Sequence, residues 1–236
     1  MPRKFWIPIV AIAALAVLGG GGAYVYYFSG LRTAPPTLAL ASPSASAGAA
    51  TTTGGTWAIT TGSLAGYRVK EQFVGQSSTH EAVARTSDVT GQASITKSGT
   101  TYELASATVT VQLGNLASVD QVAGYNVTNR DRIVQGSLRV SSFPIAVFVA
   151  QPVALPAGVE SGQAVNVTVP GQLTIHGVTK DVTASLQLRV SGTTAQIAGT
   201  IATNMTDFGI SPPNIGFTTV QPAVTIEVSL NLAQGA

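Results

Sequence analysis

Residues 171–181 read Gly-Gln-Leu-Thr-Ile-His-Gly-Val-Thr-Lys-Asp and join two runs in which apolar and polar residues alternate. In the preceding run valines occupy every second position from Val165 to Val169, and in the following run apolar residues do so from Val182 to Val190. Alternation with a period of two on both sides of a short glycine-containing turn is typical of an antiparallel hairpin with one buried face. Residues 171–181 therefore predict a β-hairpin with His176 in its turn.

The same pattern of short β-like runs continues from Thr56 to the C-terminus. Breaks that contain glycine separate the runs Trp57–Thr60, Gly66–Phe73, Ser87–Ile95, Thr101–Leu113, Ile145–Val153, Val165–Ile175, Val182–Val190, Gln196–Thr203 and Val224–Leu232. Strands at this spacing, without a long helix, indicate an all-β sandwich or barrel.

One short helix is predicted inside this β-rich region. Asn129 would cap residues 130–135 and Gly136 would end the helix. Residues 118–125 could add another turn, and both pieces would cover one end of a barrel.

The N-terminus has a different composition. Residues 5–28 carry no charge, and Arg3 and Lys4 precede them. A helix of this length, at about 1.5 Å per residue, spans the roughly 30 Å hydrocarbon core of a bilayer. The two cations would keep residues 1–4 in the cytoplasm and place the rest of the chain outside as a single-pass membrane protein. The alternative is a signal peptide with its apolar region at Ile7–Leu18, which cleavage would remove to leave a secreted protein.

Residues 29–55 are rich in Ala, Ser, Thr, Pro and Gly and predict a flexible linker before a domain at residues 56–236. From Thr56 onward, nine Lys or Arg stand against ten Asp or Glu, because three of the twelve cations lie at Arg3, Lys4 and Arg32. The domain thus has no excess of positive charge, so we expect no nucleic-acid partner. The absence of cysteine excludes disulfides and a lipoprotein anchor.

The amino-acid sequence of the hairpin turn resembles a characteristic motif of a known family. Leu173–Lys180, Leu-Thr-Ile-His-Gly-Val-Thr-Lys, is similar to a segment of the YceI-like family of bacterial envelope proteins. Five further segments resemble motifs of that family in matching order: Ser63–Val69, Val89–Gly91, Asn129–Asp131 with Phe143, Pro144 and Phe148, Thr206–Ile210, and Val224–Leu232. Two positions depart from the family pattern, with Met205 where Arg is frequent and Ile133 where His is frequent.

The resemblance implies an eight-stranded antiparallel, lipocalin-like β-barrel with a short helical cover. It also implies binding of a polyisoprenoid or another long-chain amphiphilic lipid outside the cytoplasm, for transport, storage or scavenging. Barrels of this family can pair, so a homodimer stays open. The alternative function is a β-module with a filled core that binds a protein or a cell-wall polymer.

An eight-stranded barrel either fills its interior with side chains or encloses one slim ligand. Each isoprene unit buries five carbons, worth about 4 kcal/mol. Apolar residues are candidates to line such a cavity, although a closed core would use the same residues: Phe73, Val109, Val111, Phe148, Leu186, Leu188, Phe208 and Phe217. Arg130 either forms a local ion pair with Asp131 or contacts a lipid headgroup such as a phosphate.

Residues with catalytic chemistry are scarce. The two histidines, His80 and His176, lack the spacing of a zinc site, and no Gly-x-Ser-x-Gly motif precedes a helix. We expect His80 in a polar loop and His176 in a structural role at the turn. Asp131, Asp181 and Asp207 could form a carboxylate pair for glycosidic chemistry, but Asp in such loops more often binds turn backbone. The sequence therefore predicts no enzyme, no metal and no cofactor.

Overall fold

The computed structural model describes residues 34–42, 54–75, 78–122 and 126–235. The predicted membrane segment, residues 5–28, lies outside them. No helix within the described residues is both long enough and apolar enough to cross a bilayer.

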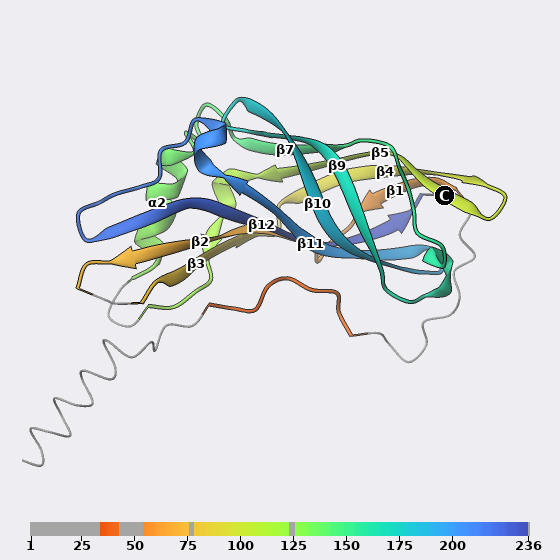
Figure 1. Ribbon diagram of the computed structural model, residues 1–236, viewed down its shortest axis with the longest axis horizontal. Coiled ribbons are helices and arrows are strands. Elements are labelled where there is room, and N and C mark those ends of the chain that lie inside the picture. The colour runs from red at the N-terminus through yellow and green to blue at the C-terminus, as the bar shows by residue number, and fades with distance from the viewer. Residues whose placement is uncertain (1–33, 43–53, 76–77, 123–125, 236) are drawn as a thin grey trace, which may run out of the picture.

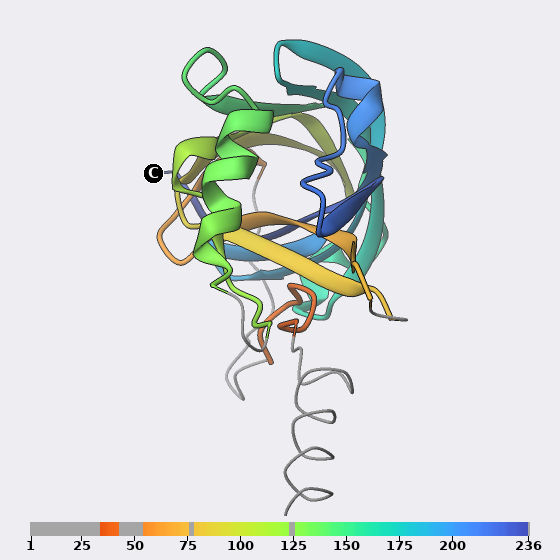
Figure 2. The same cartoon turned by 90° about the vertical axis from the view of Figure 1, so that its left-hand side faces the viewer.

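Eight antiparallel strands close into a barrel, as Figures 1 and 2 show. The circuit closes because the first strand pairs with the last, Trp57 opposite Gln234. In spatial order the strands are β1 (Gly55–Ile59), β4 (Val89–Ser98), β5 (Thr101–Gln112), β7 (Ile145–Ala150), β9 (Val165–Ile175), β10 (Val178–Ser191), β11 (Thr194–Asn204) and β12 (Thr218–Gln234). The predicted eight-stranded antiparallel barrel is confirmed.

Four further strands extend this barrel: β2 (Leu64–Phe73), β3 (His80–Thr86), β6 (Ala117–Ser118) and β8 (Val153–Ala154). The long strand β12 pairs with β1 near its C-terminal end and with β2 along the rest of the same edge. β2 pairs with β3, and β3 pairs with β6. β1–β2 and β3–β4 are therefore two long strands, each with a break, rather than four independent ones.

The prediction of a polar loop around His80 is wrong, because β3 begins at this residue and its side chain is only 3% exposed. The central residues of β3, Ala82, Val83 and Ala84, are all buried. Since three consecutive apolar residues are flanked by charged ones, β3 lacks the alternation that marks the other strands.

The hairpin at residues 171–181 is confirmed. β9 ends at Ile175 and β10 begins at Val178, so the turn consists of His176 and Gly177 alone. Both residues have positive φ, 55° and 75°, as a two-residue hairpin turn of type I′ requires. A side chain at Gly177 would also meet the ring of Phe143, whose nearest atom lies 2.6 Å from the position of a Cβ.

The helix α2 (Thr128–Ser137) lies across one end of the barrel (Figure 2). The predicted cap at Asn129 is wrong, because Asn129 lies inside the helix. The side chain of Asn126 instead accepts hydrogen bonds from the backbone N–H and the hydroxyl of Thr128. In the part of the chain that the structure describes, three short 3₁₀ helices complete the fold: η2 (Leu113–Asn115), η3 (Val159–Ser161) and η4 (Met205–Phe208).

The two ends of the barrel differ. At the open end lie α2, η4, the His176–Gly177 turn and the ends of β2 and β12 that meet where Phe73 pairs with Thr218. At the far end lie the β4–β5 and β10–β11 turns, where Trp57, Tyr102 and Leu232 are buried. Residues 34–42, part of the predicted linker, run along the outside of the barrel wall (Figure 1).

We predict that Gly199→Ala destabilises the barrel by about 1–3 kcal/mol, because a Cβ at this position would lie 2.1 Å from the backbone oxygen of Ser185 on the paired strand. Gly136→Ala in α2 is the matched control. No atom lies within 4 Å of its Cβ position, so it should stabilise the protein by up to about 1 kcal/mol. Urea unfolding followed by circular dichroism measures both, and equal effects would contradict the close approach at Gly199.

Candidate functional site

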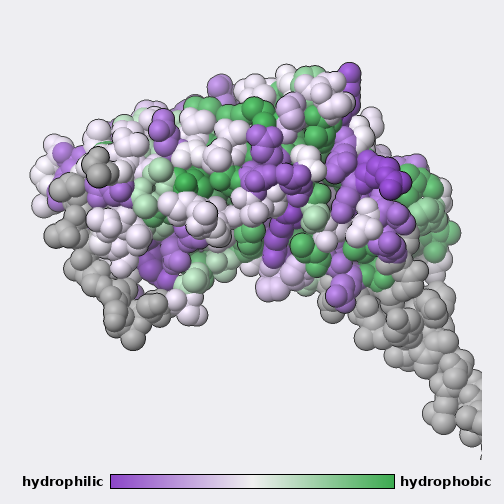
Figure 3. All heavy atoms as spheres, turned by 180° about the vertical axis from the view of Figure 1, so that it is seen from behind, coloured by the Kyte–Doolittle hydropathy of each residue, from purple (hydrophilic) through white to green (hydrophobic). Residues whose placement is uncertain are grey.

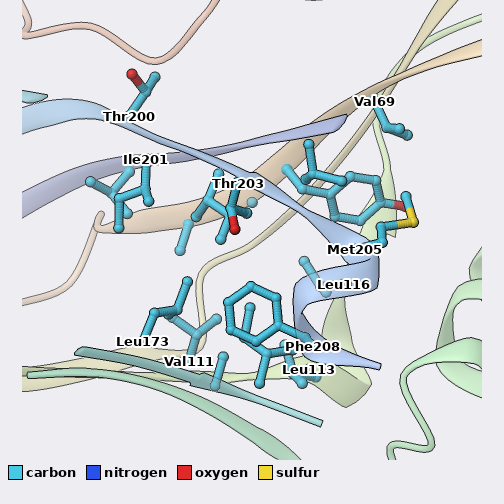
Figure 4. Close-up of a pocket in the computed structure, with 18 of the residues that line it drawn as sticks. Val69, Val111, Leu113, Leu116, Leu173, Thr200, Ile201, Thr203, Met205 and Phe208 are labelled. Carbon is cyan, nitrogen blue, oxygen red and sulfur yellow. The ribbon is translucent and has the colours of Figure 1, made fainter. Parts of the chain in front are cut away.

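The barrel encloses a cavity of about 280 Å³ that extends to the open end. Side chains from opposite walls face one another across it (Figure 4). Ile201 and Thr203 of β11 lie on one side, and Phe208 of η4 lies across from them together with Val111 and Leu173. The volume is near the lower end of the roughly 300–1,000 Å³ typical of small-molecule pockets.

The strands line this cavity because every second side chain along each of them points inward. On β12 the inward positions after Thr218 carry apolar residues, Val220, Val224, Ile226, Val228 and Leu230. The residues between them face the outside, as successive side chains of a strand must. The same rule operates on the other walls, so the lining is almost entirely apolar.

A smaller cavity of about 80 Å³ adjoins the first toward the far end. Five residues line both cavities: Ala93, Leu104, Val169, Leu186 and Ile197. The apolar interior therefore continues along the barrel axis beyond the main cavity.

Six of the eight predicted lining residues line the main cavity: Phe73, Val109, Val111, Phe148, Leu186 and Phe208. Leu188 lines only the smaller cavity. Phe217 lines neither cavity, and its side chain is 46% exposed. It precedes β12, and its backbone oxygen accepts a hydrogen bond from Val74 N–H at the end of β2, so the strand alternation does not set its direction.

Apart from Phe208 on η4, sequence reasoning missed the lining residues outside the strands. α2 contributes Ile133 and Val134, η4 contributes Met205, and the loop before β12 contributes Pro213 and Ile215. The apolar side of the predicted helix was the available signal for the first two. Nothing local in the sequence marks Pro213 and Ile215.

A buried polar cluster lies beside the cavity at the open end. It consists of Glu71 on β2, His80 on β3, Asp120 after β6 and Arg130 on α2. Arg130 donates from Nη1 and Nη2 to the two oxygens of Asp120, at 2.7 and 3.0 Å, and from Nη2 to Glu71 at 2.9 Å. His80 Nε2 lies 2.7 Å from the Asp120 carboxylate, so the cluster joins four separate elements.

These contacts correct the local pairing predicted for Arg130 and Asp131. Asp131 instead accepts hydrogen bonds from the backbone N–H and the hydroxyl of Ser118. The acceptors of Arg130 are ten and 59 positions away along the chain. A guanidinium and two carboxylates reach one another only because α2 folds back over β2.

His176 has a structural role at the turn, as predicted. Its Nδ1 lies 3.2 Å from the backbone oxygen of Phe208, and its ring meets Phe143 edge-on. The turn is thereby fixed against η4.

Burial acts in the same direction on Glu71, Asp120 and Tyr67, but hydrogen bonds reverse its effect on the pKa of Asp120. Burial raises the pKa of Glu71 above its ordinary value, although Arg130 opposes the effect. Burial would also raise the pKa of Asp120, but hydrogen bonds from His80, Arg130 and the Val83 N–H outweigh it and hold that pKa well below its usual range. Burial likewise raises the pKa of Tyr67, which keeps its phenol protonated.

Tyr67, Glu71 and Arg130 also line the main cavity. Because two carboxylates share the guanidinium of Arg130, the cluster presents hydrogen-bonding groups to the cavity without an uncompensated positive charge. Such a site suits a neutral polar group, such as a hydroxyl or a carbonyl, better than a phosphate.

Glu71, His80 and Asp120 also have the residue types of a metal site, with ligand atoms within 4.8 Å of one another. A divalent cation there would lie next to the guanidinium of Arg130, which already donates to both carboxylates. Repulsion between these cations favours an ion-pair network over metal binding.

Comparisons with known proteins agree with this architecture. The family model described as "YceI-like domain" matches residues 60–232. A polyisoprenoid-binding domain from Saccharophagus degradans, implicated in plant cell wall breakdown, is 14% identical with a TM-score of 0.52, over 76% of this chain and 98% of that one.

Two other solved structures are also similar to this chain. BcnA from Burkholderia cenocepacia is 20% identical with a TM-score of 0.47, over 70% of this chain and 95% of its own. The YceI protein of Campylobacter jejuni is 16% identical with a TM-score of 0.40, over 69% and 84%. No curated protein matches the chain.

We predict that Arg130→Met lowers the free energy of unfolding by about 3–5 kcal/mol, because it leaves the buried carboxylates of Glu71 and Asp120 without their cation. Arg132→Met is the matched control, since Arg132 lies on the same helix and is exposed. It should change stability by less than about 0.5 kcal/mol. Urea unfolding of the two variants checks this, and equal losses would show that Arg130 does not stabilise the cluster.

A second prediction concerns pH. The raised pKa of Glu71 means that its contribution to stability is fully present below the pKa of the unfolded chain, about 4.3, and is lost as pH rises through the folded value. Glu71→Gln keeps an acceptor for Arg130 and removes this titration. The stability of the variant relative to the wild type should therefore increase as pH rises from about 4 to 8.

Urea unfolding across that pH range measures the difference. Glu103→Gln, at an exposed position on β5, is the control and should follow the wild type. Parallel curves for Glu71→Gln and the wild type would contradict the prediction.

Proposed function

This chain belongs to the YceI-like family, and we propose that its barrel binds one long-chain isoprenoid or related amphiphilic lipid. The observation that carries the proposal is the apolar cavity of about 280 Å³ inside a closed barrel, continued by a second one toward the far end. A barrel with a filled core would not leave such a space, so the cavity favours a ligand over the alternative of a purely adhesive β-module.

An apolar chain is the ligand that this lining suits. Each isoprene unit transferred from water to the cavity contributes about 4 kcal/mol, at about 0.8 kcal/mol per carbon. The tail would enter at the open end and extend between β11 and the opposite wall toward Leu186 and Ile197, which line both cavities.

We place the polar head of the lipid at the open end, beside Tyr67, Glu71 and Arg130. Arg130 would then contact the headgroup, as the sequence suggested, but as a hydrogen-bond donor that two carboxylates already neutralise. An alcohol, a phenol or a quinone fits this arrangement better than a phosphate, whose charge would face Glu71 and Asp120.

The proposed role is that of a carrier or store outside the cytoplasmic membrane rather than an enzyme. Two of the carboxylates considered for glycosidic chemistry have structural partners, since Asp131 binds Ser118 and Asp181 accepts a hydrogen bond from Gln172. Residues 5–28 would anchor the protein in the membrane, which is its source of lipid.

Native mass spectrometry of the chain purified from the envelope of its own host, followed by organic extraction, tests the proposal. We expect one prenyl or acyl species per barrel, and saturable binding of polyprenol or quinone probes after the lipid is removed. A protein that is empty and also fails to take up these probes would reject lipid binding and favour the filled-core interaction module.

We predict that Ile201→Trp blocks this binding. Ile201 is buried and points into the cavity (Figure 4), so an indole there would occupy space that the lipid needs. Affinity should fall by up to about a thousandfold for each isoprene unit displaced, because one unit is worth about 4 kcal/mol and each 1.4 kcal/mol is tenfold. Titration with a fluorescent polyprenol analogue measures the loss.

Ala202→Trp is the matched control. Ala202 is the next residue on β11 and is exposed on the outer face, so its indole should leave affinity unchanged. Equal affinities for Ile201→Trp and the wild type, with unchanged circular dichroism, would place the ligand elsewhere.

A further inference from the structure

Residues 34–42 form a strap along the outside of the barrel wall. Arg68 Nη2 donates to the backbone oxygen of Pro35, and Arg85 Nη2 donates to that of Pro36 at 2.6 Å. Further along, Leu38 N–H donates to Glu227 at 3.2 Å. Two consecutive prolines favour an extended backbone here because the proline ring fixes φ.

The arginines that hold the strap are themselves fixed. Arg68 and Arg85 both donate to Glu227, each at 2.7 Å, and the Glu227 side chain is fully buried. At the other end of the strap, Arg189 donates to the backbone oxygen of Ala41 at 2.7 Å. The strap therefore has a rigid attachment at several points on the barrel.

The register of the strands gives the strap a direction. Arg68, which holds Pro35, lies opposite Thr225 on β12. Arg189, which holds Ala41, lies opposite Gln196, and Gln196 lies opposite Asn231. β12 runs from the open end to the far end, so the strap runs the same way and its N-terminal end points toward the open end.

Exposed apolar side chains gather at this open end. Val74, Ile215 and Phe217, here called the lip, are 73%, 39% and 46% exposed. They are neighbours, because Val74 N–H donates to the backbone oxygen of Phe217 and Ile215 N–H to that of Thr218. Ile215 also lines the main cavity, so the lip lies at its mouth.

The far end has no such surface among the described residues. Three other large apolar side chains are exposed among the described residues: Ile145 at the open end, Val119 next to Asp120 of the polar cluster, and Val149 on the wall strand β7. Hydrophobic side chains are visible at the open end in Figure 3, at the right of the view.

Exposed cations also lie near this end: Lys70, Arg132, Arg139 and Lys180. Exposed acidic side chains in the same region are equal to them in number: Asp88, Asp181, Asp207 and Glu81, which lies opposite Lys70 and has a side chain that is 42% exposed.

We propose that the lip docks on the surface of a lipid bilayer and that the strap holds the barrel so that its cavity opens toward that membrane. The proposal rests on the proposed function and on residues 5–28 as a membrane anchor. Apolar side chains that enter the membrane interface bind peripheral proteins to bilayers through the apolar area that they bury.

The length of the chain supports this orientation. Six Cα–Cα steps connect Phe28 with Ala34, so the two can be at most about 20 Å apart. Five residues of β2, from Arg68 to Phe73, place the strap's start roughly 17 Å from the lip. Nine residues of β12, from Thr225 to Gln234, place it roughly 30 Å from the far end. A barrel with its strap in place can therefore stand on its open end, but not on its far end.

The experiment uses the whole chain, which has no cysteine of its own. A single cysteine is introduced at Val74→Cys in the lip or at Thr100→Cys in the exposed β4–β5 turn of the far end. Each variant is labelled with an environment-sensitive fluorophore and reconstituted into vesicles of zwitterionic and anionic lipids with brominated acyl chains. We expect several-fold stronger quenching at position 74 than at position 100.

Ile215→Ser with Phe217→Ser, added to the Val74→Cys variant, should abolish most of that quenching. Val149→Ser is the control, because Val149 is 45% exposed on β7, away from the lip, and it should leave the quenching unchanged. Circular dichroism confirms that the variants fold.

Equal quenching at the two ends, or quenching that survives the double serine variant, would overturn the proposal. So would self-quenching between labels at position 74 without quenching by the lipids, since a second copy of the chain would then cover the lip. Organic extraction of the same preparations separates the two hypotheses. Bound lipid with an unquenched lip would reject docking alone, and a quenched lip without bound lipid would reject the proposed function alone.

Discussion

Closure of the sheet through β12 is the constraint on which the rest of the structure depends. This strand pairs with β11 along one edge and with both β1 and β2 along the other. The circuit thereby leaves no free edge among its eight strands, and every inward side chain must face another across the axis. Closure brings the alternate, inward side chains of β12 together with those of the other strands as one apolar wall. A cavity remains because many of the side chains that face one another across the axis are small.

Small side chains explain why the interior is not full. Six alanines line the main cavity: Ala65, Ala93, Ala107, Ala146, Ala150 and Ala184. An eight-stranded barrel is just wide enough for large side chains to fill it, so alanine at inward positions leaves a space that aromatic residues would have closed. Aromatic residues line both cavities: Tyr67, Phe73, Phe148 and Phe208 the main one, and Trp57 and Tyr102 the smaller one at the far end. The alanines of the main cavity therefore account for the space that remains between its aromatic side chains.

The strands and the hairpin could be predicted from the sequence because their information is local. His176 and Gly177 adopt the turn that their residue types favour, and the alternating runs became strands close to the expected limits. β3 was missed because Ala82, Val83 and Ala84 interrupt the alternation. The polar cluster was missed for a different reason, since Arg130 finds Glu71 59 positions away. Only the packing of α2 over β2 brings these charges together, and the spacing of the residues along the sequence does not indicate this contact.

One strand, β2, connects the features of the open end. Its inward residues Tyr67 and Glu71 line the cavity. Arg68, which directly follows Tyr67, faces the outside and holds the strap. A slip of one residue against β12 would exchange these faces. Arg68 would then enter the apolar cavity, and Glu71 would leave Arg130 without one of its acceptors. Because burying an unpaired charge is far more costly than losing a pair on the surface, the two ion-pair networks select a single register for β2. The polar cluster, the strap and the mouth of the cavity are consequently fixed relative to one another by the same strand.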